Sequence, residues 1–177
     1  DQFRSDKKLA ELLDQAMGTF ENDKRIKLID DLYQYNEPYK NSLTGKRGNA
    51  INAFLFMWAP QKHVSVVSLG DRQRLIQFFG FEGGPDFEKG SPGEKIVKSN
   101  EALVSGFASY FGNQYSPRTV CVFLYHFPEV REDWRAEKIG EEDIGRGWSA
   151  RPGGTHVEIS DTTVEESKPT NHDLSLF

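Results

Sequence analysis

The sequence predicts an α+β fold, a helix-rich single domain with a small antiparallel β element. Apolar residues recur at three- and four-residue spacing in several segments, which is typical of helices that bury one face. β-branched residues gather at 64–67, and apolar and polar residues alternate over 155–160, which favours strands. The predicted domain covers residues 1–160, and we expect the polar stretch 161–177 to be a tail or linker.

Two helices are expected near the N-terminus, paired as an antiparallel hairpin. Ser5 can cap the first helix. Its apolar stripe comprises Leu9, Leu12, Leu13, Ala16, Met17 and Phe20. Asn22 can cap the second helix, which ends at Pro38 because the residue before a proline avoids helical backbone. The small polar residues of 40–49 predict a loop after this hairpin.

The stretch 49–81 has the densest run of large apolar side chains and is expected to anchor the core. Its first part, 50–58, fits a helix or a buried strand, and length does not decide between them. We prefer a β-hairpin in which 50–58 pairs with the valine-rich 64–68 through a turn at Pro60. A helix is expected to follow, with Ser68 at its start.

The start of a long helix is marked by the clearest local signal in the chain. Ser91 is expected to cap it, Pro92 to occupy the first helical position and Glu94 to complete a capping box. Apolar residues at helical spacing follow, and Gly112 is expected to close the helix.

A cap followed by a proline recurs at Ser116, and the helix it starts is expected to end at Pro128. The chain then becomes strongly charged. Trp134 lies within this charged segment, and we expect it to cover the core as a lid.

Composition limits the classes of function. The 177-residue chain has a net charge of −5, which argues against broad, non-specific binding to nucleic acids but leaves room for a local basic patch. No apolar run is long enough to span a membrane, and no signal peptide is evident. Cys121 is the single cysteine and lies in an apolar run, so we expect a buried thiol and a cytoplasmic location. The chain begins at Asp1, and we expect it to be part of a longer protein.

No catalytic or cofactor-binding motif is evident. The four histidines lack the spacing of zinc ligands, so no metal or cofactor is expected. Asp86 and the later Glu166 and Lys168 match the residue types of the PD…ExK motif of metal-dependent nucleases. That chemistry needs its acid and lysine on a core strand, whereas Glu166 and Lys168 lie in the polar tail. A nuclease is therefore kept only as a third alternative.

Basic residues cluster around the central stretch. They are Lys40, Lys46, Arg47, Lys62, His63, Arg72 and Arg74. Basic side chains can hold a phosphate backbone, and the flat faces of Trp58 or Trp148 can lie against a base. The plainer interpretation is that these cations are the solvated edges of apolar segments and that Trp58 belongs to the core.

The pattern GNAINAFLFMWAPQKHVSVVSLGDRQRLIQFFGF, followed later by FLYHFPEVREDW, resembles N-terminal regions of bacterial defence proteins. These regions precede the motor domain of McrB-type restriction GTPases, which act on DNA with modified cytosine, or precede nuclease domains. The resemblance implies a specificity module that reads DNA, often at a modified base. No GTPase motor sequence is present, so that activity would belong to other parts of the parent protein.

We therefore expect a non-catalytic DNA-recognition module of a restriction or defence protein. The first alternative is a protein-interaction or regulatory domain that uses an apolar patch and the acidic segment 129–143.

Overall fold

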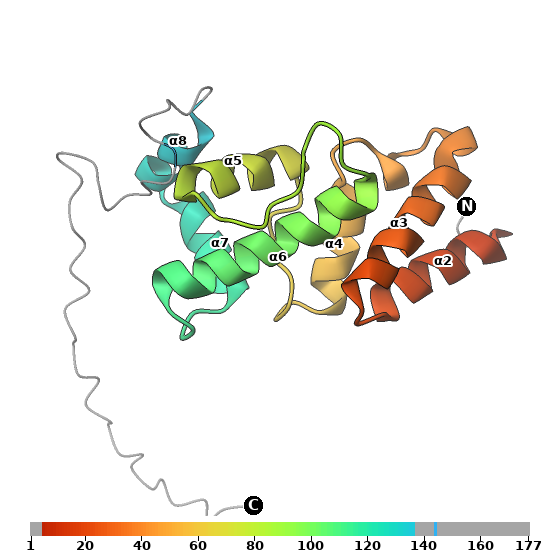
Figure 1. Ribbon diagram of the computed structural model, residues 1–177, viewed down its shortest axis with the longest axis horizontal. Coiled ribbons are helices and arrows are strands. Elements are labelled where there is room, and N and C mark those ends of the chain that lie inside the picture. The colour runs from red at the N-terminus through yellow and green to blue at the C-terminus, as the bar shows by residue number, and fades with distance from the viewer. Residues whose placement is uncertain (1–4, 137–143, 145–177) are drawn as a thin grey trace, which may run out of the picture. The chain divides into compact units, whose positions relative to one another are not determined.

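A computed structural model describes residues 5–136 and 144, and in these residues every regular element is a helix (Figure 1). The elements are α2 (Lys7–Gly18), α3 (Asn22–Asn36), η1 (Glu37–Tyr39), η2 (Ser42–Thr44), α4 (Asn49–Trp58), α5 (Leu69–Phe79), α6 (Pro92–Phe111), α7 (Pro117–His126) and α8 (Pro128–Arg135). The predicted α+β class is therefore wrong, and the described part of the chain is all-α. The predicted strand at 155–160 and the tail 161–177 lie outside the described residues.

The expected hairpin of 50–58 with 64–68 does not form, because residues 49–58 are helix α4. Gly48 has a positive φ of 66° just before the helix, and Ile51 and Leu55, one turn apart, point into the core. Residues 64–68 form neither helix nor strand. Apolar spacing alone was ambiguous here, and tertiary packing selected the helix.

Side chains from three helices satisfy the backbone of 64–68, in place of a strand ladder. Asn52 of α4 donates to the Val67 carbonyl at 2.7 Å, and Arg72 of α5 donates to the Val66 carbonyl at 2.7 Å. Asn100 of α6 accepts from the Val64 backbone N–H at 3.0 Å. Val64 and Val66 are thus buried in a connecting segment in which these three backbone groups have side-chain partners.

Helices α2 and α3 pack against each other as the expected pair. The cap of α2 is Asp6 rather than the predicted Ser5, since the Asp6 carboxylate accepts from the Leu9 N–H at 3.0 Å. Arg25 of α3 donates to the carbonyls of Ala16 and Thr19, so it satisfies the open C-terminal end of α2.

Helix α6 crosses α3 closely and also packs on α5 and α7 (Figure 1). The predicted capping box is confirmed, with Ser91 and Glu94 each accepting from the other's backbone N–H at 3.1 Å. Gly93 donates its N–H to Asp30 of α3 at 2.7 Å. A Cβ on Gly93 would lie 2.2 Å from the Ile26 carbonyl oxygen, so the crossing depends on glycine.

Two helices follow α6, where one was expected. Ser116 caps α7 as predicted, accepting from the Thr119 N–H at 3.2 Å. Pro128 does not end the helical structure but starts α8 at its first position. Trp134 is no lid: its side chain is fully buried, and its indole N–H donates to the Leu124 carbonyl at 3.0 Å. Cys121 is buried, as predicted.

Candidate functional site

The site begins where helices α4 and α5 start. The Leu69 backbone N–H donates to the Arg47 carbonyl at 3.0 Å, which brings the residues before both helices together. A groove of about 660 Å³ opens beside this junction and reaches Ala136 at the end of α8. Its lining residues include Arg47, Asn49, Ser68, Gly70, Asp71 and Arg74.

Arginines outnumber carboxylates at this groove. Asp71 is the only acidic residue among those lining it in the described part of the chain. Its carboxylate accepts from Tyr125 at 2.9 Å and from Arg135 at 3.3 Å, and Arg74 lies 3.6 Å from its other oxygen. Arg47 has no ion pair among the described residues. The groove is therefore locally cationic in an acidic protein.

Tyr125 is the hydroxyl donor of this hydrogen bond with Asp71. Burial, followed by the nearby Asp71 charge, raises the pKa of the Tyr125 phenol above its usual value. The phenol thus stays protonated and donates to the carboxylate. Because Asp71 is already shared by Tyr125, Arg135 and Arg74, it offsets little of the charge of Arg47.

Both helix starts add positive partial charge to the groove. The N-cap of α4 is Gly48, which has no side chain, and Ser68 at the N-cap of α5 makes no side-chain cap hydrogen bond. N–H groups in the first turn of a helix lack intrahelical partners, and the helix dipole adds positive potential there. Anions such as phosphate commonly bind at such positions. The groove can hold an anion through guanidinium groups, a serine hydroxyl and backbone N–H groups.

Arg72, one of the predicted nucleic-acid-binding residues, is not at the surface. Its side chain has 0% exposed area, and its Nη1 donates to the Ile96 carbonyl at 3.0 Å and to Ser99 Oγ at 3.2 Å. With its bond to Val66, the guanidinium links the segment 64–68 to α6. Burial lowers the pKa of Arg72 to about 9, and no ion pair offsets this within the described residues. Arg72 therefore stabilises the fold and does not reach DNA.

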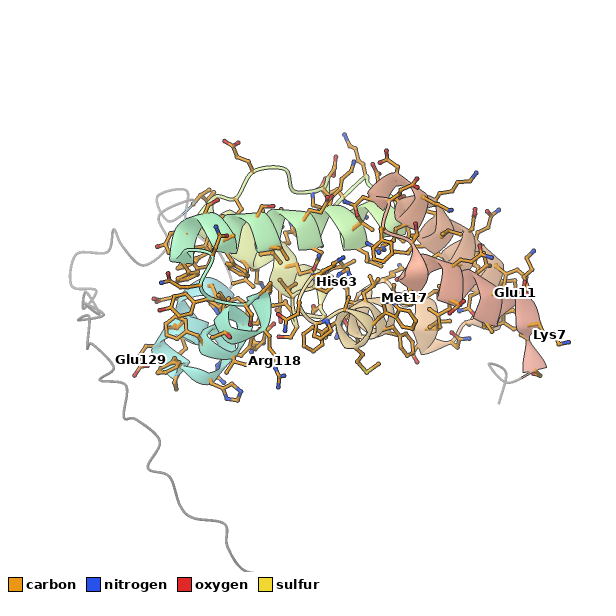
Figure 2. All side chains as sticks on the ribbon, turned by 90° about the horizontal axis from the view of Figure 1, so that it is seen from below. Lys7, Glu11, Met17, His63, Arg118 and Glu129 are labelled. Atoms are coloured by element: carbon orange, nitrogen blue, oxygen red, sulfur yellow. The ribbon has the colours of Figure 1, made fainter. Side chains whose placement is uncertain are left out.

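His63 is also removed from the predicted surface, with 5% of its area exposed. Figure 2 shows it beneath α6, in the interior of the helical array. Burial, followed by the positive charges of Arg25 and Arg72, lowers the pKa of His63 to about 4. The imidazole is therefore neutral at pH 7 and offers no charge to a phosphate.

The remaining predicted residues lie at two ends of α4. Lys46 is exposed beside Arg47, at the start of the helix. Trp58 ends the helix with 61% of its area exposed, and Lys62 follows in the next turn. Ten helical residues span about 15 Å, so Trp58 and Lys62 are separated from the groove by that length. Trp148 lies outside the described residues.

Sequence reasoning missed the partners that shape the groove. Asp71 lies three residues before Arg74, a helical spacing that could have indicated their pairing. Tyr125 and Arg135 come from α7 and α8, more than 50 residues away, and no local pattern connects them to Asp71.

The nuclease alternative gains no geometry from the described residues. Asp86 accepts from the backbone N–H groups of Glu88 and Lys89, both at 2.9 Å, and so stabilises the turn that it begins. Glu166 and Lys168 lie outside the described residues. Within the part of the chain that the structure describes, no three His, Cys, Asp or Glu side chains are placed to hold a metal ion.

Comparison of the chain with protein families, with curated proteins and with solved structures finds no match. Among the described helices, none combines the length and apolar character that crossing a bilayer requires.

Proposed function

We propose that this chain is a non-catalytic DNA-binding module whose groove, at the starts of α4 and α5, holds the phosphate backbone. The supporting observation is the convergence of Arg47 and Arg74 with two helix starts that have no side-chain cap. Arginine suits this role because its planar guanidinium can donate two hydrogen bonds to one phosphate. In this proposal Lys46, which is exposed beside Arg47, contacts a neighbouring phosphate.

The groove supplies affinity and position rather than sequence information. Phosphate contacts fix a protein on DNA, whereas base edges carry the sequence. Recognition of a modified base, and a place in a restriction or defence protein, are parts of the proposal that rest on the sequence resemblance to McrB-type N-terminal regions. A cytoplasmic location belongs to the same proposal and is in keeping with the single, buried cysteine.

A binding titration with fluorescently labelled DNA tests the proposal. We expect a 20-base-pair duplex of random sequence to bind at about 50 mM salt, and Arg47→Ala to weaken binding by roughly tenfold. Arg118→Ala is the matched control, because Arg118 is exposed near the start of α7 and does not line the groove (Figure 2). Duplexes carrying 5-methylcytosine or N6-methyladenine then show whether the module prefers a modification.

Two results would reject DNA binding through the groove. One is the absence of any binding to unmodified or modified duplexes at low salt. The other is binding that Arg47→Ala and Arg118→Ala weaken equally, since that would mean a diffuse charge effect rather than a defined groove.

A further inference from the structure

Helix α4 leaves an unusual amount of apolar surface uncovered. Eight of its ten residues are apolar, yet only two of these eight, Ile51 and Leu55, are buried. Met57 and Trp58, at its C-terminal end, are 65% and 61% exposed. Large apolar side chains grouped in this way usually mark a surface that another molecule covers.

Phe20, a further exposed apolar residue, lies at the same edge as this end of α4. Phe20, in the turn between α2 and α3, is 81% exposed, and the Lys62 Nζ lies 4.7 Å from the centre of its ring. The Lys62 backbone N–H donates to the Ala59 carbonyl at 2.9 Å, which folds this residue back onto the end of α4. Figure 1 shows the α2–α3 turn and the end of α4 at the same edge. We call Phe20, Met57, Trp58 and Lys62 the α4 patch.

The size of the α4 patch indicates a small occupant. The exposed parts of Phe20, Met57 and Trp58 amount to roughly 400 Å², taking about 200 Å² for each residue. A stable interface between two globular proteins buries about 800 Å² on each partner. A short segment of chain therefore fits the patch better than a second folded copy, and the net charge of −5 also opposes self-association.

The charge at the patch indicates what the segment carries. Lys62 has no ion pair among the described residues, and its ammonium group lies on an aromatic ring. An aspartate or glutamate next to apolar side chains would pair with this ammonium while the apolar groups cover Met57 and Trp58. Trp, Met and Phe are also enriched in protein interfaces, with Trp frequent among the residues that dominate binding.

We infer that the α4 patch docks a short peptide segment of a partner protein, with large apolar side chains beside an acidic residue. The patch and the groove lie at opposite ends of α4, about 15 Å apart, so this interaction does not depend on DNA binding.

Peptide selection with the intact 177-residue protein tests the inference. A phage-displayed library of random peptides, each about one dozen residues long, is panned against the protein, and enriched peptides are synthesised for binding titrations. We expect enriched sequences to combine two or more large apolar residues with Asp or Glu. Trp58→Ala should weaken their binding by about tenfold or more, and Lys62→Glu should do the same until the acidic residue of the peptide is changed to lysine.

Tyr115→Ala, at an exposed aromatic residue between α6 and α7, is the matched control and should leave binding unchanged. Circular dichroism confirms that each variant is folded. Three results would overturn the inference. They are the absence of any enriched peptide that depends on Trp58, a dimer in sedimentation that Met57→Lys dissociates, and binding of oligo(dT) that depends on Trp58 without any such peptide.

Discussion

Arg72 and Arg74 differ by two positions and have opposite roles. Two helical residues correspond to a rotation of about 200°, so these arginines leave α5 on opposite faces. Arg72 enters the core and bonds to Val66, Ile96 and Ser99, whereas Arg74 lines the groove. Composition could identify the basic cluster but not this division, because it depends on which face of α5 the other helices cover.

Substitution of Arg72 should lower stability without acting through the groove. We expect Arg72→Lys to reduce the free energy of unfolding by about 2–4 kcal/mol, because an ammonium group cannot reach all three acceptors at once. Urea unfolding measures this change, and Arg74→Lys, on the exposed side, is the control expected to change stability by less than about 0.5 kcal/mol. Equal effects of the two variants would contradict the structural role of Arg72.

His63 should make stability depend on pH in a defined window. Its pKa is about 4 in the folded protein and about 6.5 in the unfolded chain, so the unfolded chain binds the proton more readily. The stability that the neutral, buried imidazole contributes is fully present above about pH 6.5. As the pH falls from there toward about 4, the unfolded chain takes up the proton first, so the free energy of unfolding decreases. The decrease attributable to His63 should be of order 2–3 kcal/mol.

Urea unfolding at about pH 7 and about pH 4.5, for the wild type and His63→Gln, isolates this effect from the titration of carboxylates. We expect the variant to lose less stability than the wild type between these two pH values. A wild type and a variant with parallel pH profiles would show that His63 is not buried in its neutral form.

At the scale of elements, local capping chemistry made the starts of α6 and α7 predictable. Ser91 and Ser116 are followed by proline, and each cap bond joins residues within one turn. Helix α4 was not predictable in the same way. We expected it to pair with 64–68 as a strand. Backbone groups of 64–68 instead bond to the side chains of Asn52, Arg72 and Asn100, which belong to three different helices.

The crossing of α3 and α6 provides a test of element packing. Gly93→Ala would place a methyl group against the Ile26 carbonyl, so we expect the free energy of unfolding to fall by more than about 3 kcal/mol. Gly18→Ala is the matched control, because a Cβ there meets nothing within 4 Å at the end of α2. It should leave stability unchanged or raise it by up to about 1 kcal/mol.

Thermal unfolding of both variants measures these changes in stability. A Gly93→Ala protein as stable as the wild type would mean that α6 does not cross α3 at this distance.

At the scale of the whole molecule, a net negative charge contrasts with the cationic groove among the described residues. The net charge is −5, yet Arg47 and Arg74 both line the groove, with a single, shared carboxylate among the described residues that line it. A net negative charge limits non-specific attraction to polyanions. The sequence predicted Arg47 and Arg74 as binding residues, but the groove itself depends on the junction of α4, α5 and α8.

The dependence of DNA affinity on salt tests this central claim most directly. Removing one phosphate-binding side chain should reduce the slope of log K against log salt concentration by about one. Between about 50 and 200 mM salt, we expect a steep slope for the wild type, a slope smaller by about one for Arg47→Ala, and the wild-type slope for Arg118→Ala. An affinity that does not change with salt, or a slope that Arg47→Ala leaves unaltered, would contradict phosphate binding at the groove.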